Sequence, residues 1–419
     1  MAAIDAASNA RPADAALGPV PPKYRIHNLD MLRGWAILGI LAVNAVSFAW
    51  PVEVTMSEAP PPVALSSADL VGLLVADVFF ADKFRTLFTM LLGVSIFLVG
   101  GERHDEARGP VLTRRLMWLG LFGLLHGAAL WYGDILLHYA YSGLVMMLFR
   151  SWPARRLLWT GGAITLLWGI VATLGYWGLA NLPPAFAAKM SAGQPASDPA
   201  AIAAAVELYR SGWPAGLIQN LKNWGMFQLL AGPFLIPVTV PLMMLGLGLF
   251  KSGWFSGRAP LWTYALTILV GGANLAVFAV WGWQDIMAGE DVDPTRGLAA
   301  AAGGMAPLIT LLYASILVLL VRFGLKPLTA WLVPVGRMAF TNYLTQTLIM
   351  VSLYYAPWGP MWFGQHGPAE MWMVVAAIWI AQLVWSPLWL SVFQMGPLEW
   401  LWRCLTYGRV VAIRKPATA

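Results

Sequence analysis

The chain has 419 residues, of which 59% are apolar and only 11% are charged, and its mean hydropathy is +0.66. A soluble domain carries about 25% charged residues, so this composition excludes an ordinary water-soluble fold. The net charge of +6 would fit nucleic-acid binding in a soluble protein. Here the basic residues gather in alternate loops between apolar segments, as in membrane proteins, so we expect no nucleic-acid partner. A single cysteine, Cys404, excludes a disulfide framework, and we expect no metal.

Apolar blocks recur along the chain at a length close to the 20 or so residues that span the hydrocarbon layer of a bilayer. We therefore predict an all-α fold, a polytopic bundle of about ten transmembrane helices with broken or re-entrant segments. The candidate spans are roughly 31–50, 84–101, 116–133, 135–150, 157–180, 223–250, 260–283, 298–321, 328–356 and 371–395.

These spans divide the chain into three parts. Residues 1–28 are expected to form a disordered cytoplasmic tail, because their first part is rich in Ala and Pro. Residues 29–395 form the bundle, in which 183–222 are expected to make an outer cap. Residues 396–419 are predicted to be a cytoplasmic interfacial helix and tail.

The charge of the loops predicts the orientation. Alternating the spans from a cytoplasmic N-terminus puts most Lys and Arg in inside loops, which places both chain ends in the cytoplasm. We expect a multi-pass protein of the bacterial cytoplasmic (inner) membrane, with the bilayer as its partner. Lys83 and Arg85 fall in an outside loop in this scheme.

Two segments depart from simple hairpins. Residues 66–82 contain Asp69, Asp77 and Asp82, so they are predicted to lie at the outer surface or to re-enter. The sixth span contains three prolines, which lack a backbone donor, so it is predicted to be kinked or broken. The alternative is that neighbouring helices accommodate these kinks without any functional role. The prolines are Pro233, Pro237 and Pro241.

Ionisable side chains within apolar spans are costly, so each is a candidate for function. At the start of the first span, Asp30 and Arg33 are three residues apart and can pair on one helix face. At the cytoplasmic interface Arg33 can also receive a phosphate. The alternative is an anchoring and capping pair. Asn44 lies deeper in the span and is either functional or a link between helices.

A second group extends from Phe122 in the third span to His138 in the fourth. His126 follows Arg115 by eleven residues, roughly 16 Å along a helix, which places the imidazole near mid-membrane. Histidine titrates near neutral pH and suits proton transfer. Asp134 is expected to cap the fourth span near the outer surface and to bond His138, but it lies two turns beyond His126 on a straight helix. The alternative is a packed histidine bonded to the backbone.

A third group lies in the ninth span. Asn342 and Gln346 are four residues apart and form a polar stripe on one face, and Arg337 precedes them. The stripe is expected to line a cavity. The alternative is that it joins helices to one another.

Four stretches of this chain, in the same order, resemble the YeiB-like family of bacterial multi-spanning membrane proteins, a family named for a domain of unknown function. They are Asp30 to Gly39, Phe122 to Leu136, Gly336 to Thr347, and Gly396 to Tyr407. That family resembles a superfamily of transmembrane acyltransferases, which includes proteins similar to heparan glucosaminide acetyltransferase and the bacterial surface-sugar acyltransferases.

The resemblance implies a site and an activity. In that superfamily an Asp–Arg–Gly motif similar to Asp30, Arg33 and Gly34 is implicated in using a cytoplasmic acyl-CoA. An aspartate and aromatics similar to Asp77, Phe79 and Phe80 follow before the second span. The resemblance implies transfer of an acyl group to a hydroxyl or amine.

This chain departs from the superfamily at two positions. It has Asn44 where the sugar acyltransferases carry a histidine, and Ser66 and Ser67 where the glucosaminide group carries one. A base for acyl transfer must then lie elsewhere, and His126 is the best candidate because it alone among the histidines is predicted deep in a span.

The resulting expectation is a membrane-embedded acyltransferase with acyl-CoA (acetyl-CoA) as donor substrate. Arg33 and Arg337 would hold the donor phosphates, His126 would be the base, and Asp134 would orient the acceptor or the imidazole. Asn44, Asn342 and Gln346 would bond the oxyanion or the donor amides. The acceptor would be a small molecule, a glycan or a lipid. The alternatives are a transporter or lipid flippase, and a non-catalytic accessory subunit.

Overall fold

The computed structural model describes residues 26–56, 59–183, 185–186, 199–288 and 302–416. Within these residues every regular element is a helix, apart from an isolated bridge between Phe393 and Arg414. The elements are α2 (His27–Ala49), α3 (Val52–Met56), α4 (Ser67–Val75), the π-helix η2 (Ala76–Phe80), α5 (Lys83–Gly100), α6 (Arg108–Ala129), α7 (Leu136–Met146), α8 (Ala154–Ala180), α10 (Pro199–Arg210), α11 (Trp213–Met226), the π-helix η4 (Phe227–Ala231), α12 (Gly232–Lys251), α13 (Leu261–Ala288), α15 (Ala306–Arg322), the 3-10 helix η5 (Lys326–Leu328), α16 (Leu332–Arg337), α17 (Ala339–Tyr354), α18 (Pro368–Val392) and α19 (Pro397–Tyr407).

Six helical segments among the described residues are long and apolar enough to cross a membrane: His27–Ala49, Ser67–Gly100, Ala154–Leu179, Phe234–Lys251, Leu261–Gln284 and Pro368–Val392. Their outer faces are apolar as well, since Trp159 on α8 and Leu269 on α13 keep 70% and 71% of their surface exposed. Exposing so many aromatic and leucine side chains to water would be unfavourable, whereas they can face the hydrocarbon tails of lipids. The predicted all-α membrane bundle is confirmed, and the count of about ten crossings remains a prediction.

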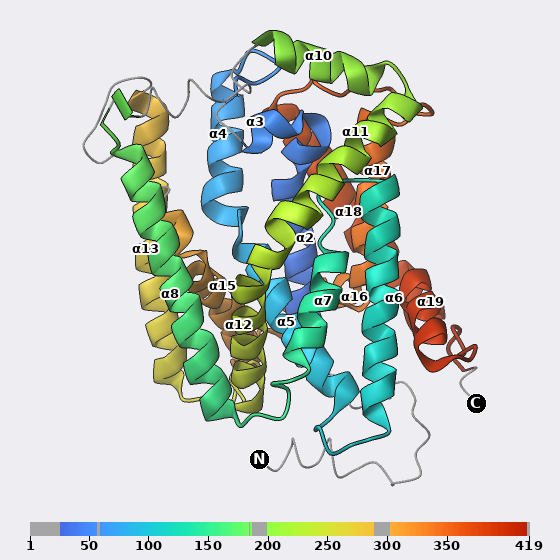
Figure 1. Cartoon of the computed structure of the whole chain (residues 1–419). Coiled ribbons are helices and arrows are strands. Elements are labelled where there is room, and N and C mark those ends of the chain that lie inside the picture. The colour runs from blue at the N-terminus through green and yellow to red at the C-terminus, as the bar shows by residue number, and fades with distance from the viewer. Residues whose placement is uncertain (1–25, 57–58, 184, 187–198, 289–301, 417–419) are drawn as a thin grey trace.

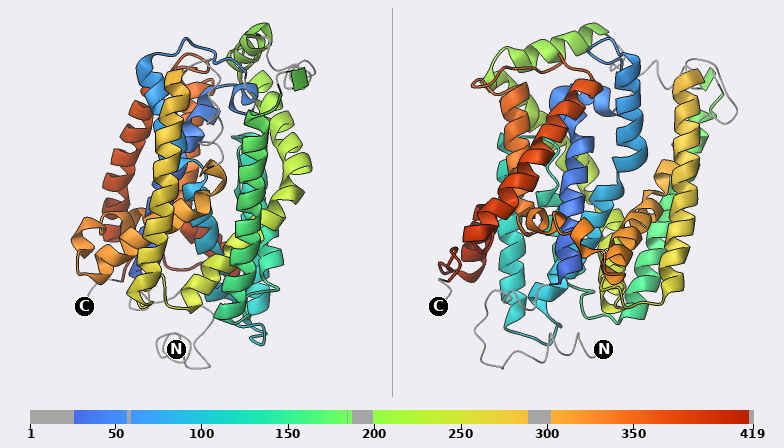
Figure 2. Two further views of the ribbon diagram at one scale, coloured as in Figure 1. Left: turned by 90° about the vertical axis from the view of Figure 1, so that its left-hand side faces the viewer. Right: turned by 180° about the vertical axis from the view of Figure 1, so that it is seen from behind.

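The helices run alongside one another around α2, which lies in the middle of the bundle (Figures 1 and 2). Several predicted spans prove shorter or divided. α7 has only 11 residues and begins inside the bundle. The ninth span is divided at Met338, where α16 ends and α17 begins at a different angle.

The segment expected to lie at the outer surface or to re-enter forms the first half of a broken, membrane-length segment. α4 and η2 run down into the bundle, the chain turns at Ala81 and Asp82, and α5 completes the crossing (Figure 1). Two of the aspartates that indicated a surface position have local roles. Asp69 forms a capping box with Ser66 at the start of α4, and Asp82 takes the left-handed backbone conformation at the break, with φ of 61°.

One helix of the segment 183–222, for which an outer cap is predicted, lies over one end of the bundle. α10 lies across that end, and α11 descends from it at a slant (Figure 1). Tyr209 of α10 stacks on Phe363 with ring centroids 4.3 Å apart. The π-helix η4 changes the hydrogen-bond pattern between α11 and α12 without ending the helix, and Pro237 and Pro241 lie inside α12, so the predicted kink or break at the prolines stays a prediction. Residues 187–198 of the cap lie outside the described residues.

The C-terminal helix α19 packs beside α6, as an amphipathic interfacial helix would. Trp402 donates to the carbonyl of Arg115 at 2.9 Å, and the Arg115 guanidinium lies 3.7 Å from the ring centroid of Trp402. The N-terminal tail predicted for residues 1–28 falls almost entirely outside the described residues.

Candidate functional site

His126 and Asp134 bond directly to each other, although they lie two turns apart in sequence. α6 ends at Ala129, and residues 130–135 turn back into the bundle before α7 begins. This turn brings the Asp134 carboxylate to within 2.9 Å of His126 Nδ1. Both side chains are almost completely enclosed, at 2% and 0% exposure. The fold therefore assembles a buried His–Asp pair that straight helices would have kept apart.

The other bonds of Asp134 indicate the tautomer of His126. The carboxylate accepts the backbone N–H of Leu136 at 3.1 Å and of Leu137 at 2.9 Å, so it caps α7 as predicted, although it is buried rather than at the surface. A carboxylate that only accepts requires His126 Nδ1 to be the donor. Nε2 then accepts the hydroxyl of Thr347 at 2.9 Å. The result is a buried Asp–His–hydroxyl chain.

The predicted bond between Asp134 and His138 is wrong. His138 lies one turn into α7 and faces α12, where its Nε2 lies 2.6 Å from the hydroxyl of Thr239. Its Nδ1 lies 2.7 Å from the hydroxyl of Tyr141. The reason is geometric: Asp134 uses its oxygens on the first turn of α7, and the helix carries His138 round to another face.

The predicted pair of Asp30 and Arg33 is present. The Arg33 guanidinium contacts Asp30 at 3.0 Å and donates to the hydroxyl of Ser95 at 2.8 Å. Asp30 and Ser95 hold the guanidinium in place, and the Arg33 side chain is 23% exposed, so part of it is accessible to a ligand. Arg337, at the end of α16, donates to the carbonyl of Gln394 at 2.9 Å.

The two amides of the third group join helices. Gln346 donates to Gln382 of α18 at 2.9 Å and to the carbonyl of Ile37 on α2 at 3.3 Å. Asn342 donates to Ser386 of α18 at 3.1 Å. Both are buried, at 2% and 0% exposure. These bonds favour the helix-joining alternative over a cavity lining, while the assignment of both residues to donor binding stays a prediction. Asn44 is half-buried on α2.

Glu399 of α19 hydrogen-bonds to the start of α17, the helix that carries Asn342 and Gln346. Its carboxylate accepts the backbone N–H groups of Phe340 and Thr341 at 2.7 and 3.1 Å, together with the Thr341 hydroxyl. It therefore caps the start of α17 from another helix. Burial raises the pKa of Glu399, and the bond from the Thr341 hydroxyl opposes that shift. Two motifs that are separate in sequence thus meet at one helix end.

A charged helix break lies inside the span Ser67–Gly100, and sequence analysis missed it. Lys83, only 1% exposed, donates to the backbone carbonyl of Asp77 at 2.6 Å, and its ammonium lies 4.4 Å from the ring centroid of Phe278. Arg85 pairs with Asp82 at 2.7 Å. Residues 77–85 contain four ionisable side chains, which indicated a loop. The apolar stretches before and after them in Ser67–Gly100 were the signal for a break within a membrane span.

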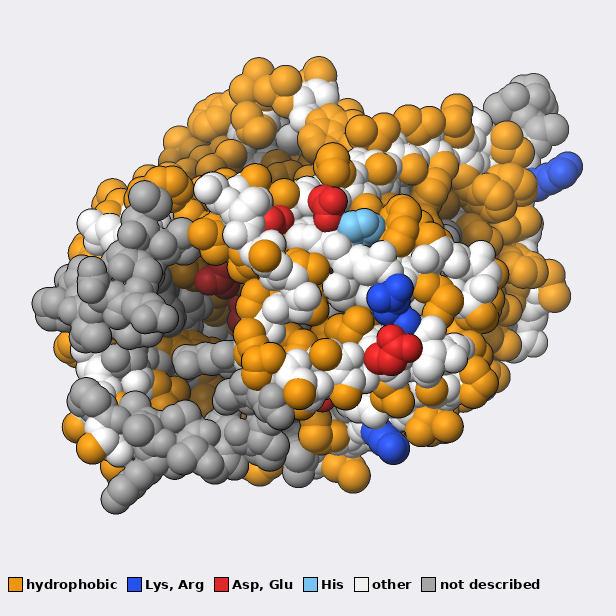
Figure 3. All heavy atoms as spheres, turned by 90° about the horizontal axis from the view of Figure 1, so that it is seen from above, with side chains coloured by type: hydrophobic (Ala, Val, Ile, Leu, Met, Phe, Trp, Pro, Cys, Tyr) orange, Lys and Arg blue, Asp and Glu red, His pale blue; other side chains and the backbone are white. Residues whose placement is uncertain are grey.

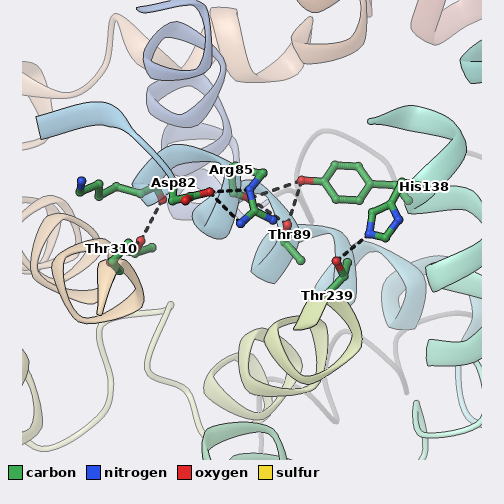
Figure 4. Close-up of polar contacts among 9 residues, drawn as sticks. Asp82, Arg85, Thr89, His138, Thr239 and Thr310 are labelled. Carbon is green, nitrogen blue, oxygen red and sulfur yellow. Dashed lines mark hydrogen bonds and ion pairs between the residues drawn. The ribbon is translucent and has the colours of Figure 1, made fainter. Parts of the chain in front are cut away.

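Hydroxyl groups from three helices form hydrogen bonds with backbone carbonyls next to this break (Figure 4). The Arg85 carbonyl accepts the hydroxyl of Thr89 at 2.8 Å and that of Tyr139 at 3.3 Å, and the two hydroxyls are 2.8 Å apart. Thr310 donates to the carbonyl of Lys83 at 2.8 Å. The side chains of α5, α7 and α15 therefore add hydrogen bonds to carbonyls in the first turn of α5, whereas the carbonyls of Asp77 and Phe79, which the break leaves open, accept from Lys83 and Tyr313.

The acids of the break remain accessible. Asp77 is exposed, and the Asp82 side chain keeps 56% of its surface exposed although it belongs to a membrane-length segment. Figure 3 looks down on the end that carries α10 and shows this face hollowed, with acidic side chains at its depth. Among the described residues, no three His, Cys, Asp or Glu side chains gather as ligands of one metal ion would.

Comparison with known proteins finds similarity over nearly the whole chain. Residues 249–409 match a family described as a protein of unknown function (DUF418). The uncharacterized protein YeiB of Escherichia coli (strain K12) is 31% identical over 400 residues, covering 90% of this chain and 95% of the relative. The uncharacterized protein YxaH of Bacillus subtilis (strain 168) is 29% identical over 420 residues, covering 94% and 97%.

Proposed function

The chain belongs to the YeiB-like family of proteins, and from this premise and the geometry of its buried polar groups we propose that it is a membrane-embedded acyltransferase. The donor is a cytoplasmic acyl-CoA such as acetyl-CoA, and the acceptor is a hydroxyl or amine at or across the membrane. The observation that carries the proposal is the imidazole of His126, whose Nδ1 is held by Asp134 and whose Nε2 is engaged by a hydroxyl.

His126 acts as the general base. The Thr347 hydroxyl occupies the position on Nε2 that an acceptor hydroxyl would take. Thr347 has a second acceptor in the carbonyl of Tyr343 at 3.4 Å, so it can turn aside and free Nε2 for the acceptor. Asp134 stabilises the imidazolium that forms when the proton is taken up. General-base catalysis of this kind typically contributes about 10²–10⁴-fold.

The donor is bound from the end of the bundle where α2 begins. Arg33 provides a guanidinium that matches a phosphate, and Arg337 stands on the helix that crosses α2 there. Gln346, next to Thr347, bonds the carbonyl of Ile37, which lies about 6 Å beyond Arg33 along α2. A donor anchored at Arg33 would therefore bring its thioester toward the level of His126.

The orientation we propose puts both chain ends in the cytoplasm of a bacterial cell, in its cytoplasmic membrane. Arg103, Arg150 and Arg258 lie in the loops that follow α5, α7 and α12, at the end of the bundle opposite α10 (Figure 1). A cluster of basic loops at one end supports this assignment.

The test is acyl-CoA turnover. Purified protein in lipid nanodiscs would be incubated with ¹⁴C-acetyl-CoA and candidate hydroxyl and amine acceptors, with CoA release followed by mass spectrometry. His126→Ala should abolish release, whereas His104→Ala, at an exposed loop position, should leave it unchanged. If the wild-type protein neither binds nor consumes acetyl-CoA, the proposal is wrong.

Transport is the second candidate, and the charged break favours it. Broken helices with intramembrane acids are typical of transporter binding sites, and Asp82 is exposed at such a break. Substrate-driven flux into liposomes without CoA, reduced by Asp82→Asn and unchanged by His126→Ala, would support transport over acyl transfer.

A further inference from the structure

Tyr343 lies beside His126 and carries a buried hydroxyl whose proton has no acceptor within the described part of the chain, while the backbone N–H of Ile135 approaches its oxygen. The two ring centroids are 5.3 Å apart, at an interplanar angle of 45°. Tyr343 is 5% exposed. A buried tyrosine hydroxyl usually finds a partner, because leaving a polar group unpaired costs about 1–3 kcal/mol. An unpaired donor next to the candidate base therefore needs an explanation.

The helix that carries Tyr343 directs it to the same place as Thr347. The two residues are four apart on α17, so they share a face, and this face meets His126 through the Thr347 hydroxyl. The carboxylate of Asp134 is close enough to interact electrostatically with the Tyr343 phenol. Base, hydroxyl and free donor thus come together where α6, α7 and α17 meet.

We propose that Tyr343 is a further catalytic residue, whose hydroxyl donates a hydrogen bond to the carbonyl oxygen of the acyl thioester. This inference rests on the proposed acyl transfer. As the acceptor oxygen or nitrogen attacks the carbonyl carbon, His126 takes up the acceptor proton and negative charge develops on the carbonyl oxygen. The C–S bond then breaks and the proton passes to the departing CoA thiolate. The products are the acylated acceptor and CoA.

Tyr343 stabilises the negative charge on the carbonyl oxygen by donating a hydrogen bond, and it keeps its own proton. A donor held ready in an apolar interior is effective because little solvent has to reorganise around the developing charge. The hydroxyl proton has no acceptor among the described residues, so no bond that it donates has to break before it can serve the thioester. The donor is kept unpaired by the fold at the position where the reaction needs it.

Tyr343→Phe tests this role, and α17 itself offers the control. Tyr354 is fully buried on the same helix, and its hydroxyl also has no partner among the described residues. It lies eleven residues further on, roughly 16 Å along the axis. Tyr343→Phe should lower kcat for CoA release by about 10²–10³-fold, and KM for acetyl-CoA should change by less than about three-fold. Tyr354→Phe should change neither.

Thermal stability separates catalysis from structure. Neither hydroxyl donates a hydrogen bond among the described residues, and Tyr343 loses only the contact of its oxygen with the Ile135 N–H, so Tm should change little in either variant. A lower Tm together with lost activity in Tyr343→Phe would mean a structural role and overturn the inference. Full activity of Tyr343→Phe beside an active wild type would overturn it alone. A wild type that never consumes acetyl-CoA would overturn the proposed function, and this inference with it.

Discussion

Gly34 of α2 and Gly336 of α16 cross with their backbones in contact, which leaves no room for a side chain at either position. A Cβ on Gly34 would overlap the carbonyl oxygen of Leu332, and a Cβ on Gly336 would overlap that of Asp30. The crossing joins the end of α2 that carries Arg33 to the helix that ends at Arg337. Two motifs about three hundred residues apart in the sequence therefore form one unit of the fold.

Replacement of Gly34 by alanine should force this crossing apart. Overpacking of this kind costs about 1–3 kcal/mol, and the displaced Arg33 should also bind acyl-CoA more weakly. Unfolding in mixed micelles, followed by tryptophan fluorescence, measures the first effect. Gly175→Ala is the control, because a Cβ there meets nothing within 4 Å. Equal losses in both variants would contradict close packing at the crossing.

Asp134→Asn should disable His126 while leaving the bundle folded. The amide nitrogen cannot accept a hydrogen bond, so the variant cannot satisfy His126, Leu136 and Leu137 together. We expect CoA release to fall by about 10³–10⁴-fold, by analogy with the serine-protease triad, and stability to fall by about 1–3 kcal/mol.

The control for Asp134→Asn is Asp105→Asn. Asp105 pairs with Arg108 at 2.9 Å in a partly exposed loop, where such pairs contribute about 0–1 kcal/mol. Unchanged turnover in Asp134→Asn would show that the pair with His126 has no catalytic role.

Gln346 and Gln382 should be coupled in stability. Gln346→Leu alone leaves the Gln382 oxygen without its donor, which costs about 1–3 kcal/mol. Gln346→Leu combined with Gln382→Leu should cost less than the sum of the single substitutions, because that unpaired amide is removed as well. Chemical unfolding of the four proteins measures the coupling. Additive losses would mean that the bond between the two amides contributes nothing.

Thr89 and Tyr139 provide a similar test at the charged break. Their hydroxyls lie 2.8 Å apart and both contact the Arg85 carbonyl. A double-mutant cycle with Thr89→Val and Tyr139→Phe should give a coupling energy of about 0.6 kcal/mol, with an upper bound near 1.7 kcal/mol, as found for hydrogen bonds between membrane helices. A coupling of zero would mean that the hydroxyls do not bond in the membrane.

Some features could be predicted from residue order alone because their causes are local. The scarcity of charge and the length of the apolar blocks predict a helical membrane bundle, since an isolated backbone in lipid must satisfy its own hydrogen bonds. Helical spacing predicts the pair of Asp30 and Arg33, and a glycine break before Asp134 predicts its capping of α7. Each of these depends on neighbours within about two turns of the chain.

Other features depend on how distant segments pack, and only the tertiary structure decided them. The bond of His126 with Asp134 needs a turn that dips into the bundle, and the bond of His126 with Thr347 needs α17 beside α6. A lone charged side chain is costly inside a membrane, so the sequence placed Lys83 in a loop. In the structure its ammonium is held within the membrane segment by the carbonyl of Asp77 and by the ring of Phe278 on α13. Sequence spacing carries no record of such partners, because packing brings them together from far along the chain.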